Sequence, residues 1–170
     1  MNLKNKLSKK SGFTLIEILV VIGLVAILAT IVLIAINPAR QFAQGRNSQR
    51  TSNVNAILNA IGQRIADNKG LFPVATGCPA LTASTVYTIG VGASAVTAVS
   101  PATVFIDMSC LVPTYIATSL PVDPNGVWNS ATDYNTRYNV TVDSVGRFTV
   151  CSEDANETVL GSPGHTCITR

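Results

Sequence analysis

The sequence predicts an α+β protein in which a long N-terminal helix packs, through its second half, against a small antiparallel β-sheet head. Three observations support this prediction. An uncharged apolar run covers residues 18–36, a helical apolar stripe follows over residues 54–65, and β-branched segments separated by turn residues fill the chain beyond residue 70. These boundaries define a basic leader (1–12), a membrane-spanning helix (13–36), an amphipathic continuation of that helix (37–69) and a β-rich globular head (70–170).

The positive charge of the chain is concentrated in the leader. Of 170 residues, 47% are hydrophobic and only 12% are charged, and the formal net charge is +3. Four of the twelve basic side chains precede Gly12, so the rest of the chain has eight basic and nine acidic side chains. A body this close to neutral has no basic surface for nucleic acid, and we expect no nucleic-acid contact for the isolated protein. The four basic residues are Lys4, Lys6, Lys9 and Lys10.

The apolar run from Phe13 to Ile36 is long enough to cross a membrane. As a helix, its 24 residues extend about 36 Å, compared with a hydrocarbon core of about 30 Å. A secretory signal peptide has an apolar core of only about 7–15 residues and a small-residue cleavage site, and the residues after Ile36 do not provide one. The leader lysines are expected to keep their end in the cytoplasm and to place the head outside it.

One carboxylate, that of Glu17, lies near the start of the apolar run. A charged side chain in the middle of a bilayer costs about 2.5–3.5 kcal/mol, so a role for it is expected. A glycine, Gly12, separates the basic leader from the run. The segment Gly12-Phe13-Thr14-Leu15-Ile16-Glu17 resembles the class III signal of type IV prepilins and related pseudopilins.

This resemblance implies a processing and assembly pathway. A prepilin peptidase would cleave between Gly12 and Phe13 and methylate the new amine of Phe13. Glu17, one helical turn from that amine, would pair with the terminal amine of a neighbouring subunit, because a paired carboxylate is tolerated in an apolar core where an unpaired one is costly. The partners so implied are the prepilin peptidase, an inner-membrane pilus assembly platform and copies of the chain itself.

The function implied is that of a structural subunit of a type IV pilus, first a single-pass membrane protein and then part of an extracellular filament for adhesion, motility or DNA uptake. A pseudopilin of a type II secretion or competence system is the alternative within the family. From another class, a single-span anchored binding protein that never assembles remains open. In that protein Glu17 would lie at the headgroup level and reach water.

The helical pattern continues beyond the membrane-spanning run. An apolar stripe with the spacing i, i+3, i+4, i+7, i+11 predicts an amphipathic helix, and Asn68-Lys69-Gly70 predicts its end. We therefore expect one helix over residues 13–69, with Gly23 and Pro38 as kink positions, and Pro38 is expected either to kink the helix or to open it locally. The resemblance implies partial melting between these two residues on assembly, and a static kink is the alternative. The stripe consists of Val54, Ile57, Leu58, Ile61 and Ile65.

Three arginines, Arg40, Arg46 and Arg50, follow the span. The simplest interpretation is a solvated helix face. The functional alternative is that they pair with acids of a neighbouring subunit, and the candidates for that pairing are Asp133, Asp143 and Asp154.

Short β-strands are predicted in the head at residues 86–91, 103–108, 138–142 and 147–151. The last two are separated by Asp143-Ser144-Val145-Gly146, which predicts a β-hairpin. Residues 120–126 form a turn cluster of proline, aspartate, asparagine and glycine.

The four cysteines lie outside any C-x-x-C pair, which argues against zinc and favours disulfides in an oxidising compartment. Four cysteines allow three pairings, and we favour the sequential one, Cys78–Cys110 and Cys151–Cys167. The loop closed by Cys151 and Cys167 resembles the disulfide-bounded C-terminal region of type IV pilins.

The sequence predicts no metal, cofactor or catalytic site. Major pseudopilins bind calcium near the C-terminus, and Asp123, Asn125 and Asp133 have suitable oxygen atoms. Their spacing matches no calcium loop, however, and Asp123-Pro124 is better explained as a turn. His165, the one histidine, lies beside Cys167, which is assigned to a disulfide, and no phosphate-binding glycine loop is present. We therefore expect a protein that is not an enzyme.

Overall fold

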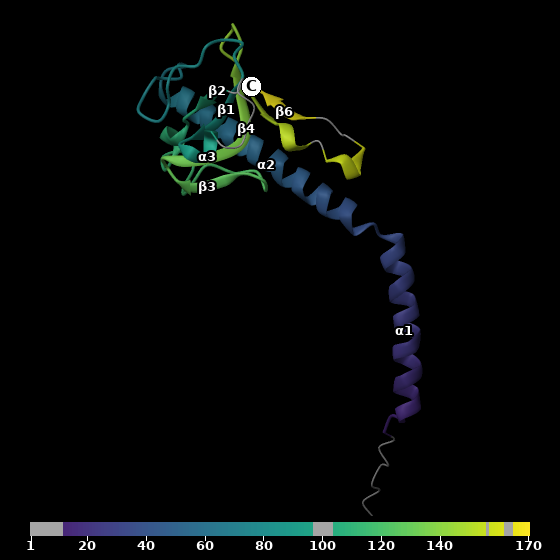
Figure 1. Cartoon of the computed structure of the whole chain (residues 1–170). Coiled ribbons are helices and arrows are strands. Elements are labelled where there is room, and N and C mark those ends of the chain that lie inside the picture. The colour runs from purple at the N-terminus through teal and green to yellow at the C-terminus, as the bar shows by residue number, and fades with distance from the viewer. Residues whose placement is uncertain (1–11, 97–103, 156, 162–164) are drawn as a thin grey trace, which may run out of the picture. The chain divides into compact units, whose positions relative to one another are not determined.

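The computed structural model describes residues 12–96, 104–155, 157–161 and 165–170 (Figure 1). The chain divides at Pro38 into two compact units. The first contains helix α1 (Leu15–Ala35), and the second contains helix α2 (Pro38–Asp67) and the head. The α+β class predicted from the sequence is confirmed, because a long apolar helix is followed by a β-sheet.

The helix expected over residues 13–69 is interrupted before Pro38, which confirms the predicted local opening there and corrects the continuous helix, because α1 and α2 are separate helices. Ile36 has extended backbone angles, with φ −97° and ψ 107°, and the next helix begins at Pro38. A proline disfavours helical angles in the residue before it, whereas its fixed φ suits the first position of a new helix. Pro38 therefore starts α2 instead of kinking a continuous helix, and α1 runs through Gly23 without interruption.

Within the described residues, six strands form one sheet in the order β2-β1-β4-β5-β6, and β3 pairs with β4 beside this path. The short helix α3 and three 3-10 turns, η1 to η3, connect them. The bounds are β1 Tyr87–Val91, α3 Ala93–Val96, β2 Val104–Ile106, η1 Ser109–Leu111, β3 Val127–Ser130, β4 Asp133–Val142, β5 Phe148–Ser152, η2 Glu153–Ala155, η3 Thr158–Leu160 and β6 Thr166–Thr169.

The sheet is mixed, which corrects the antiparallel prediction. Strands β1 and β2 run parallel, with Tyr87 opposite Val104 and Ile89 opposite Ile106, whereas the other pairs are antiparallel. A parallel pair needs a crossover of about a dozen residues or more. The segment between β1 and β2, which includes α3, has that length.

Strand β4 is the centre of the sheet. Along one side it pairs with β1, and along the other it pairs first with β3 and then with β5. Arg137, between these two stretches, has a positive φ of 59°, and its amide donates to Asn135 Oδ1. This local irregularity lies between the part of β4 that pairs with β3 and the part that pairs with β5.

The hairpin predicted at residues 143–146 is confirmed. Asp143 Oδ1 accepts hydrogen bonds from the amides of Val145 and Arg147, and Gly146 adopts a φ of +89°. A left-handed angle of this kind favours glycine. Strands β3 and β6 were not predicted, since both are four residues long and lie at edges of the sheet.

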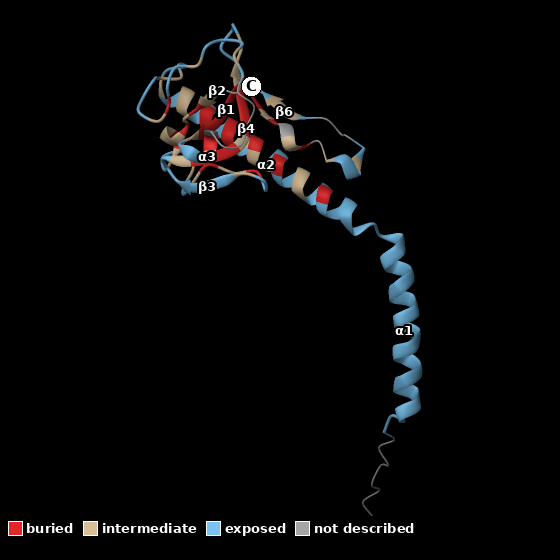
Figure 2. Ribbon diagram, in the orientation of Figure 1, coloured by how far each residue is buried: buried red, intermediate tan, exposed pale blue. Residues whose placement is uncertain are grey.

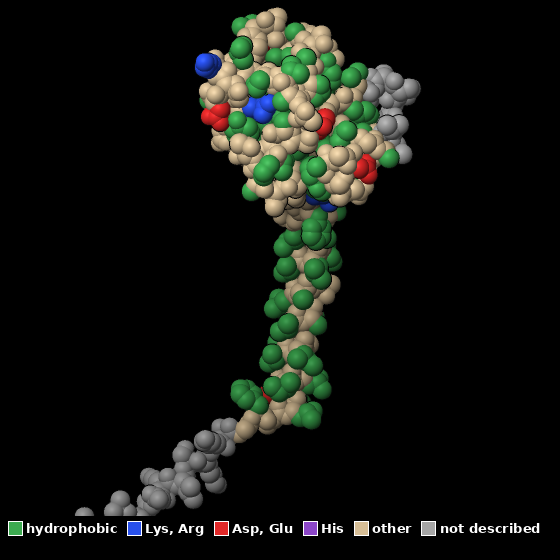
Figure 3. All heavy atoms as spheres, turned by 90° about the vertical axis from the view of Figure 1, so that its left-hand side faces the viewer, with side chains coloured by type: hydrophobic (Ala, Val, Ile, Leu, Met, Phe, Trp, Pro, Cys, Tyr) green, Lys and Arg blue, Asp and Glu red, His purple; other side chains and the backbone are tan. Residues whose placement is uncertain are grey.

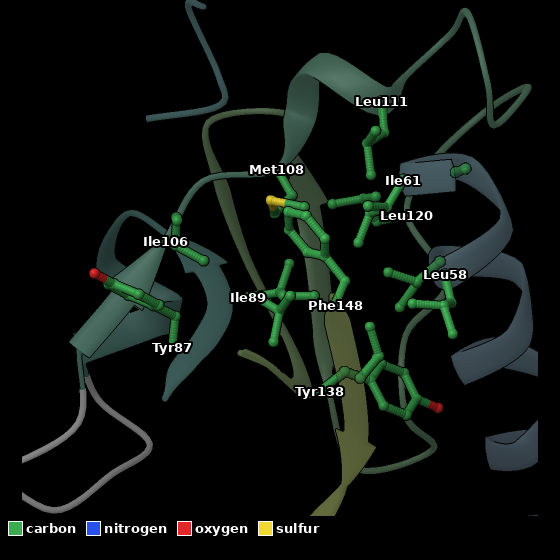
Figure 4. Packing of buried hydrophobic residues seen from close by; sticks show 14 of the residues in the cluster. Leu58, Ile61, Tyr87, Ile89, Ile106, Met108, Leu111, Leu120, Tyr138 and Phe148 are labelled. Atoms are coloured by element: carbon green, nitrogen blue, oxygen red, sulfur yellow. The ribbon is translucent and has the colours of Figure 1, made fainter. Parts of the chain in front are cut away.

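The core lies between α2 and the sheet. Figure 4 shows Ile89, Tyr138 and Phe148 from the strands grouped with Leu58 and Ile61 of α2. The predicted stripe supplies the helix side of this core, and its members Val54 and Ile57 are fully buried. The predicted helix end is confirmed as well, since α2 ends at Asp67.

Candidate functional site

Helix α1 presents apolar side chains on all sides and buries none of its residues. Each large apolar side chain from Leu15 to Ile34 is at least 52% exposed. Figure 2 shows this exposure along the whole helix, and Figure 3 shows the hydrophobic side chains that cover its visible face. Since burying one such side chain is worth about 1.5–3 kcal/mol, this surface requires lipid or other apolar helices around it.

By length and composition, α1 is able to cross a membrane. Its 21 residues extend about 32 Å, close to the thickness of a hydrocarbon core. The helix fits a membrane-anchored precursor.

The bond between Gly12 and Phe13 lies in exposed backbone outside the helix. Both residues precede α1, which begins at Leu15 with Thr14 as its N-cap. Phe13 is 85% exposed, and no heavy atom beyond its chain neighbours comes within 4 Å of the position a Cβ would take at Gly12. A peptide bond in this position is accessible to a peptidase without unfolding of the helix.

Thr14 and Glu17 form a capping box at the start of α1. Glu17 Oε2 accepts hydrogen bonds from the backbone amide and the hydroxyl of Thr14, each at 2.8 Å, and the amide of Glu17 donates to Thr14 Oγ1 at 3.3 Å. These bonds satisfy amides that have no partner within the helix. The carboxylate is therefore held by its own helical turn before any second molecule is present.

Glu17 is among the site residues predicted from the sequence, whereas Thr14 is not. The signal was available, because threonine three residues before glutamate, ahead of an apolar run, is the pattern of a capping box. The pairing of Glu17 with a neighbouring amine needs a second subunit and stays a prediction.

A second polar cluster joins α2 to the C-terminal part of the head. Arg50 is fully buried, and so is the carboxylate of Asp123. Arg50 Nε donates to Asp123 Oδ2 at 2.6 Å, and Arg50 Nη1 donates to Glu157 Oε1 at 2.7 Å. Arg46 donates to both oxygens of Glu157, at 2.7 and 2.8 Å. Glu157 thus bridges two arginines that lie one helical turn apart.

The ion pairs shift the pKa values of Arg50 and Glu157. Burial alone lowers the pKa of Arg50, but the hydrogen bonds to Asp123 and Glu157 outweigh burial and raise it. Hydrogen bonds from Arg46 and Arg50 lower the pKa of Glu157 to about 2. Arg46, Arg50 and Glu157 are therefore charged near neutral pH.

The interpretation of the three arginines as a solvated face is wrong for Arg50, and Arg46 has its partner inside the chain. Arg50 extends the apolar stripe backwards, since it lies four residues before Val54, and Ala43, seven residues earlier, is buried too. That spacing was the signal that could have identified Arg50 as an inward-facing residue.

The acids proposed as partners from a neighbouring subunit have contacts within the chain. Asp154 pairs with Arg137 and Asp143 pairs with Arg147. Asp133 accepts hydrogen bonds from the amide of Ser94 and the side chain of Asn129.

Two of the candidate calcium ligands, Asp123 and Asp133, accept hydrogen bonds from protein groups. Asp123 faces Arg50, and its Oδ1 accepts the amide of Asn125 at 2.9 Å, which is the turn expected there. In the part of the chain that the structure describes, no three His, Cys, Asp or Glu side chains are grouped to hold a metal ion. His165 is exposed just before β6.

Both disulfides have the sequential pairing favoured by the sequence, Cys78–Cys110 and Cys151–Cys167. The second joins β5 to β6, where Cys151 and Cys167 are directly opposite each other. Glu157 lies inside the loop that this disulfide closes.

A comparison with known protein families supports the prediction made from the N-terminal segment. Residues 7–33 match the family model described as the prokaryotic N-terminal methylation motif. This motif is the class III signal of type IV pilins and pseudopilins, and it implies processing by a prepilin peptidase and assembly into a pilus-like polymer. Searches of curated proteins and of solved structures returned no match to this chain.

Proposed function

We propose, from the class III signal in residues 7–33, that this chain is a structural subunit of a type IV pilus. The observation on which the proposal depends is the combination of that signal with α1, whose apolar surface is exposed on every side. A membrane surrounds such a helix before assembly, and the α1 helices of other copies surround it afterwards. In the filament the association depends on packing, since lipid is as apolar as the helices themselves.

Processing changes the chemistry at the start of α1. Hydrolysis of the Gly12–Phe13 bond leaves a free amine on Phe13, and a methyl donor then methylates it. Glu17 lies one turn further along the helix, held by Thr14. The amine of a neighbouring subunit gives this carboxylate a charged partner, which fixes the register between two helices in an apolar filament core.

Two observations support a pilus subunit over a pseudopilin. The Cys151–Cys167 disulfide closes a C-terminal loop like the one that the sequence resemblance associates with type IV pilins. The Asp123 carboxylate, a candidate calcium ligand, binds Arg50 instead. A pseudopilin of a secretion or competence system remains the second candidate, since it has the same signal.

The proposed role is structural and not enzymatic. The head lies outside the cytoplasm, where its two disulfides are stable, and an inner-membrane assembly platform adds the processed subunit to the filament. The filament then serves adhesion, motility or DNA uptake.

Mass spectrometry of the N-terminal peptide, on filaments sheared from the cell surface, tests this proposal. We expect a peptide that begins with N-methylated Phe13. A Gly12→Val variant is the control, and it should keep Met1 and stay in the membrane. If the unaltered chain begins at Met1 and never leaves the membrane, the anchored binding protein replaces the pilus subunit.

A second experiment separates assembly from folding. Glu17→Ala should leave the head folded and the signal cleaved but impair filament formation. Glu17→Asp keeps the charge on a shorter side chain and should retain part of the assembly. Normal filaments from Glu17→Ala would contradict the role given to the carboxylate.

A further inference from the structure

The first turns of α2 present an aromatic side chain to solvent. Phe42 is 69% exposed, and no other large apolar side chain of α2, all of whose residues are described, is exposed. Figure 2 shows these turns beyond the sheet and mostly in the colour of exposed residues. A single exposed apolar side chain is ordinary on a protein surface. Phe42 becomes informative because the same chain has a site that fits its ring.

That site is an apolar groove at the other end of α2. The groove has a volume of about 230 Å³, and it lies between Ile65 near the end of the helix, the segment that follows the helix, and the β4–β5 hairpin. Leu71 and Phe72 line it from the segment, and Val142 and Phe148 line it from the hairpin. Leu71 is 72% exposed, so the groove is open to solvent.

The aromatic walls of the groove are held in place by the head itself. The ring centroids of Phe72 and Phe148 are 5.3 Å apart with an angle of 49° between the rings, and the guanidinium of Arg64 lies 5.4 Å from the centroid of the Phe72 ring. Phe148 is buried, and its backbone exchanges two hydrogen bonds with Arg170. Contacts of these kinds fix the orientation of aromatic rings. The groove therefore exists before anything binds in it.

The groove fits the ring of Phe42, but not that of its own molecule. An apolar cavity of about 150 Å³ binds benzene, so a groove of about 230 Å³ admits one phenyl group. Phe42 and Ile65 belong to the same helix, whose rise of 1.5 Å per residue puts them about 35 Å apart along its axis. Because the ring cannot cross this distance, the Phe42 that enters the groove comes from a second copy.

We propose that Phe42 of one copy inserts into the groove of another and so forms a contact between heads. This inference rests on the proposed function, because it requires a filament. The ring and the groove are different surfaces, so each copy gives one ring and receives another. A heterologous contact of this kind continues as an open helical assembly unless its rotation closes a ring. It agrees with the pilus-like polymer that the N-terminal signal implies.

The proposed contact adds to the packing of α1. An aromatic side chain in an apolar pocket is typical of the few residues that dominate the stability of an interface. In this arrangement the two heads in contact are displaced from each other by about 35 Å along α2. The heads, as well as the α1 helices, then determine the spacing of subunits in the filament.

Cysteine cross-linking of filaments sheared from cells tests the contact. The Phe42→Cys/Leu71→Cys variant has one new thiol on each side of it, and the native cysteines are held in the two disulfides. Oxidation by an added small-molecule disulfide should join the copies into a ladder of dimers, trimers and longer chains on a denaturing, non-reducing gel.

The matched control is Gln44→Cys/Leu71→Cys. Gln44 is exposed in the same turn as Phe42, but positions two residues apart point to different sides of a helix, so this variant should give no ladder. Filaments of Phe42→Cys/Leu71→Cys without a ladder, or equal ladders from both variants, would overturn the contact. The proposed function would stand in either case, because filaments had formed.

The yield of sheared filaments decides the question if the cysteine variants do not assemble. Phe42→Ala and Leu71→Gln should each lower the yield by about tenfold or more, as expected for an interface anchor and its pocket. Phe42→Leu keeps an apolar side chain and should lower it by less than about threefold, and Gln44→Ala should not change it. Normal yields from Phe42→Ala and Leu71→Gln refute the contact, whereas an unaltered chain that forms no filaments refutes the proposed function itself.

Discussion

Helices α1 and α2 each contain a charged side chain where charge is costly. The groups that stabilise the two charges lie at very different separations along the sequence. In α1, Glu17 is satisfied by Thr14, three residues away. In α2, Arg50 is fully buried and binds Asp123 and Glu157, which are 73 and 107 residues away. The first arrangement forms with the helix itself, whereas the second requires the folded head.

The two helices therefore depend on different parts of the chain. The structure of α1 is local, so its exposed apolar surface remains available for lipid or for other copies. The structure of α2 depends on the head, because its core-facing side and its buried arginine both meet residues far along the sequence. Substitutions in the two helices should therefore affect different measurements.

The largest effect is expected from Arg50→Met, which leaves the buried carboxylate of Asp123 without its cation. Breaking a buried ion pair on one side typically costs about 3–5 kcal/mol, and we expect a loss of this size in the urea-unfolding free energy of the head. Glu17→Ala, in the other helix, should leave that free energy unchanged.

A double variant checks the cause of this loss. Arg50→Met with Asp123→Asn removes both charges, so part of the stability should return. If the double variant is as unstable as the sum of the two single variants, the burial of an unpaired charge is not the cause.

The next effect concerns packing. Ile57 is fully buried between α2 and the sheet, so Ile57→Ala should cost about 2–5 kcal/mol of head stability. Ile27 in α1 is 62% exposed, and Ile27→Ala should leave the head unchanged. Thermal unfolding of the chain in micelles measures the loss of head stability in each variant. Equal losses in the two variants would mean that α1 packs on the head.

The pH dependence of head stability should reveal the Glu157 ion pairs. The pKa of Glu157 is lowered from 4.5 to about 2, so its contribution is complete above pH 4.5 and is lost as the pH falls toward 2. Urea midpoints across this range should decrease more steeply for the unaltered chain than for Glu157→Gln. Parallel curves would show that Glu157 does not contribute.

The smallest effect is expected at the start of α1. Thr14→Ala removes the capping box and should cost about 1 kcal/mol locally, seen as about fivefold faster amide exchange in the first turn of α1. Thr14→Ser retains a hydroxyl and should exchange like the unaltered chain. Equal exchange in Thr14→Ala would show that the cap does not stabilise the helix.

The sequence was sufficient for features that depend on neighbouring residues. The apolar run, the stripe from Val54 to Ile65, the hairpin at residues 143–146 and the fold class were all predictable from local periodicity and turn chemistry. The capping box was equally local, and Thr14 was overlooked although its spacing from Glu17 shows it.

Features that depend on distant pairing were not predictable. Nothing near Arg50 indicates that Asp123 and Glu157 will neutralise it, and only its place on the extended stripe suggests that it faces inward. The parallel alignment of β1 and β2 likewise depends on the path of the chain between them. The break before Pro38 was available from the sequence, but a kink and a new helix start produce the same local signal.

The ion pairs of the head have a consequence for behaviour in salt. Residues 39–170 contain eight basic and eight acidic side chains. Four of the arginines form ion pairs with acidic side chains of the same chain. At physiological ionic strength, charges on separate molecules are already screened beyond about 8 Å, so little electrostatic force remains between two heads. Since the basic and acidic side chains are equal in number, copies of this head repel one another little, and added salt changes that repulsion little.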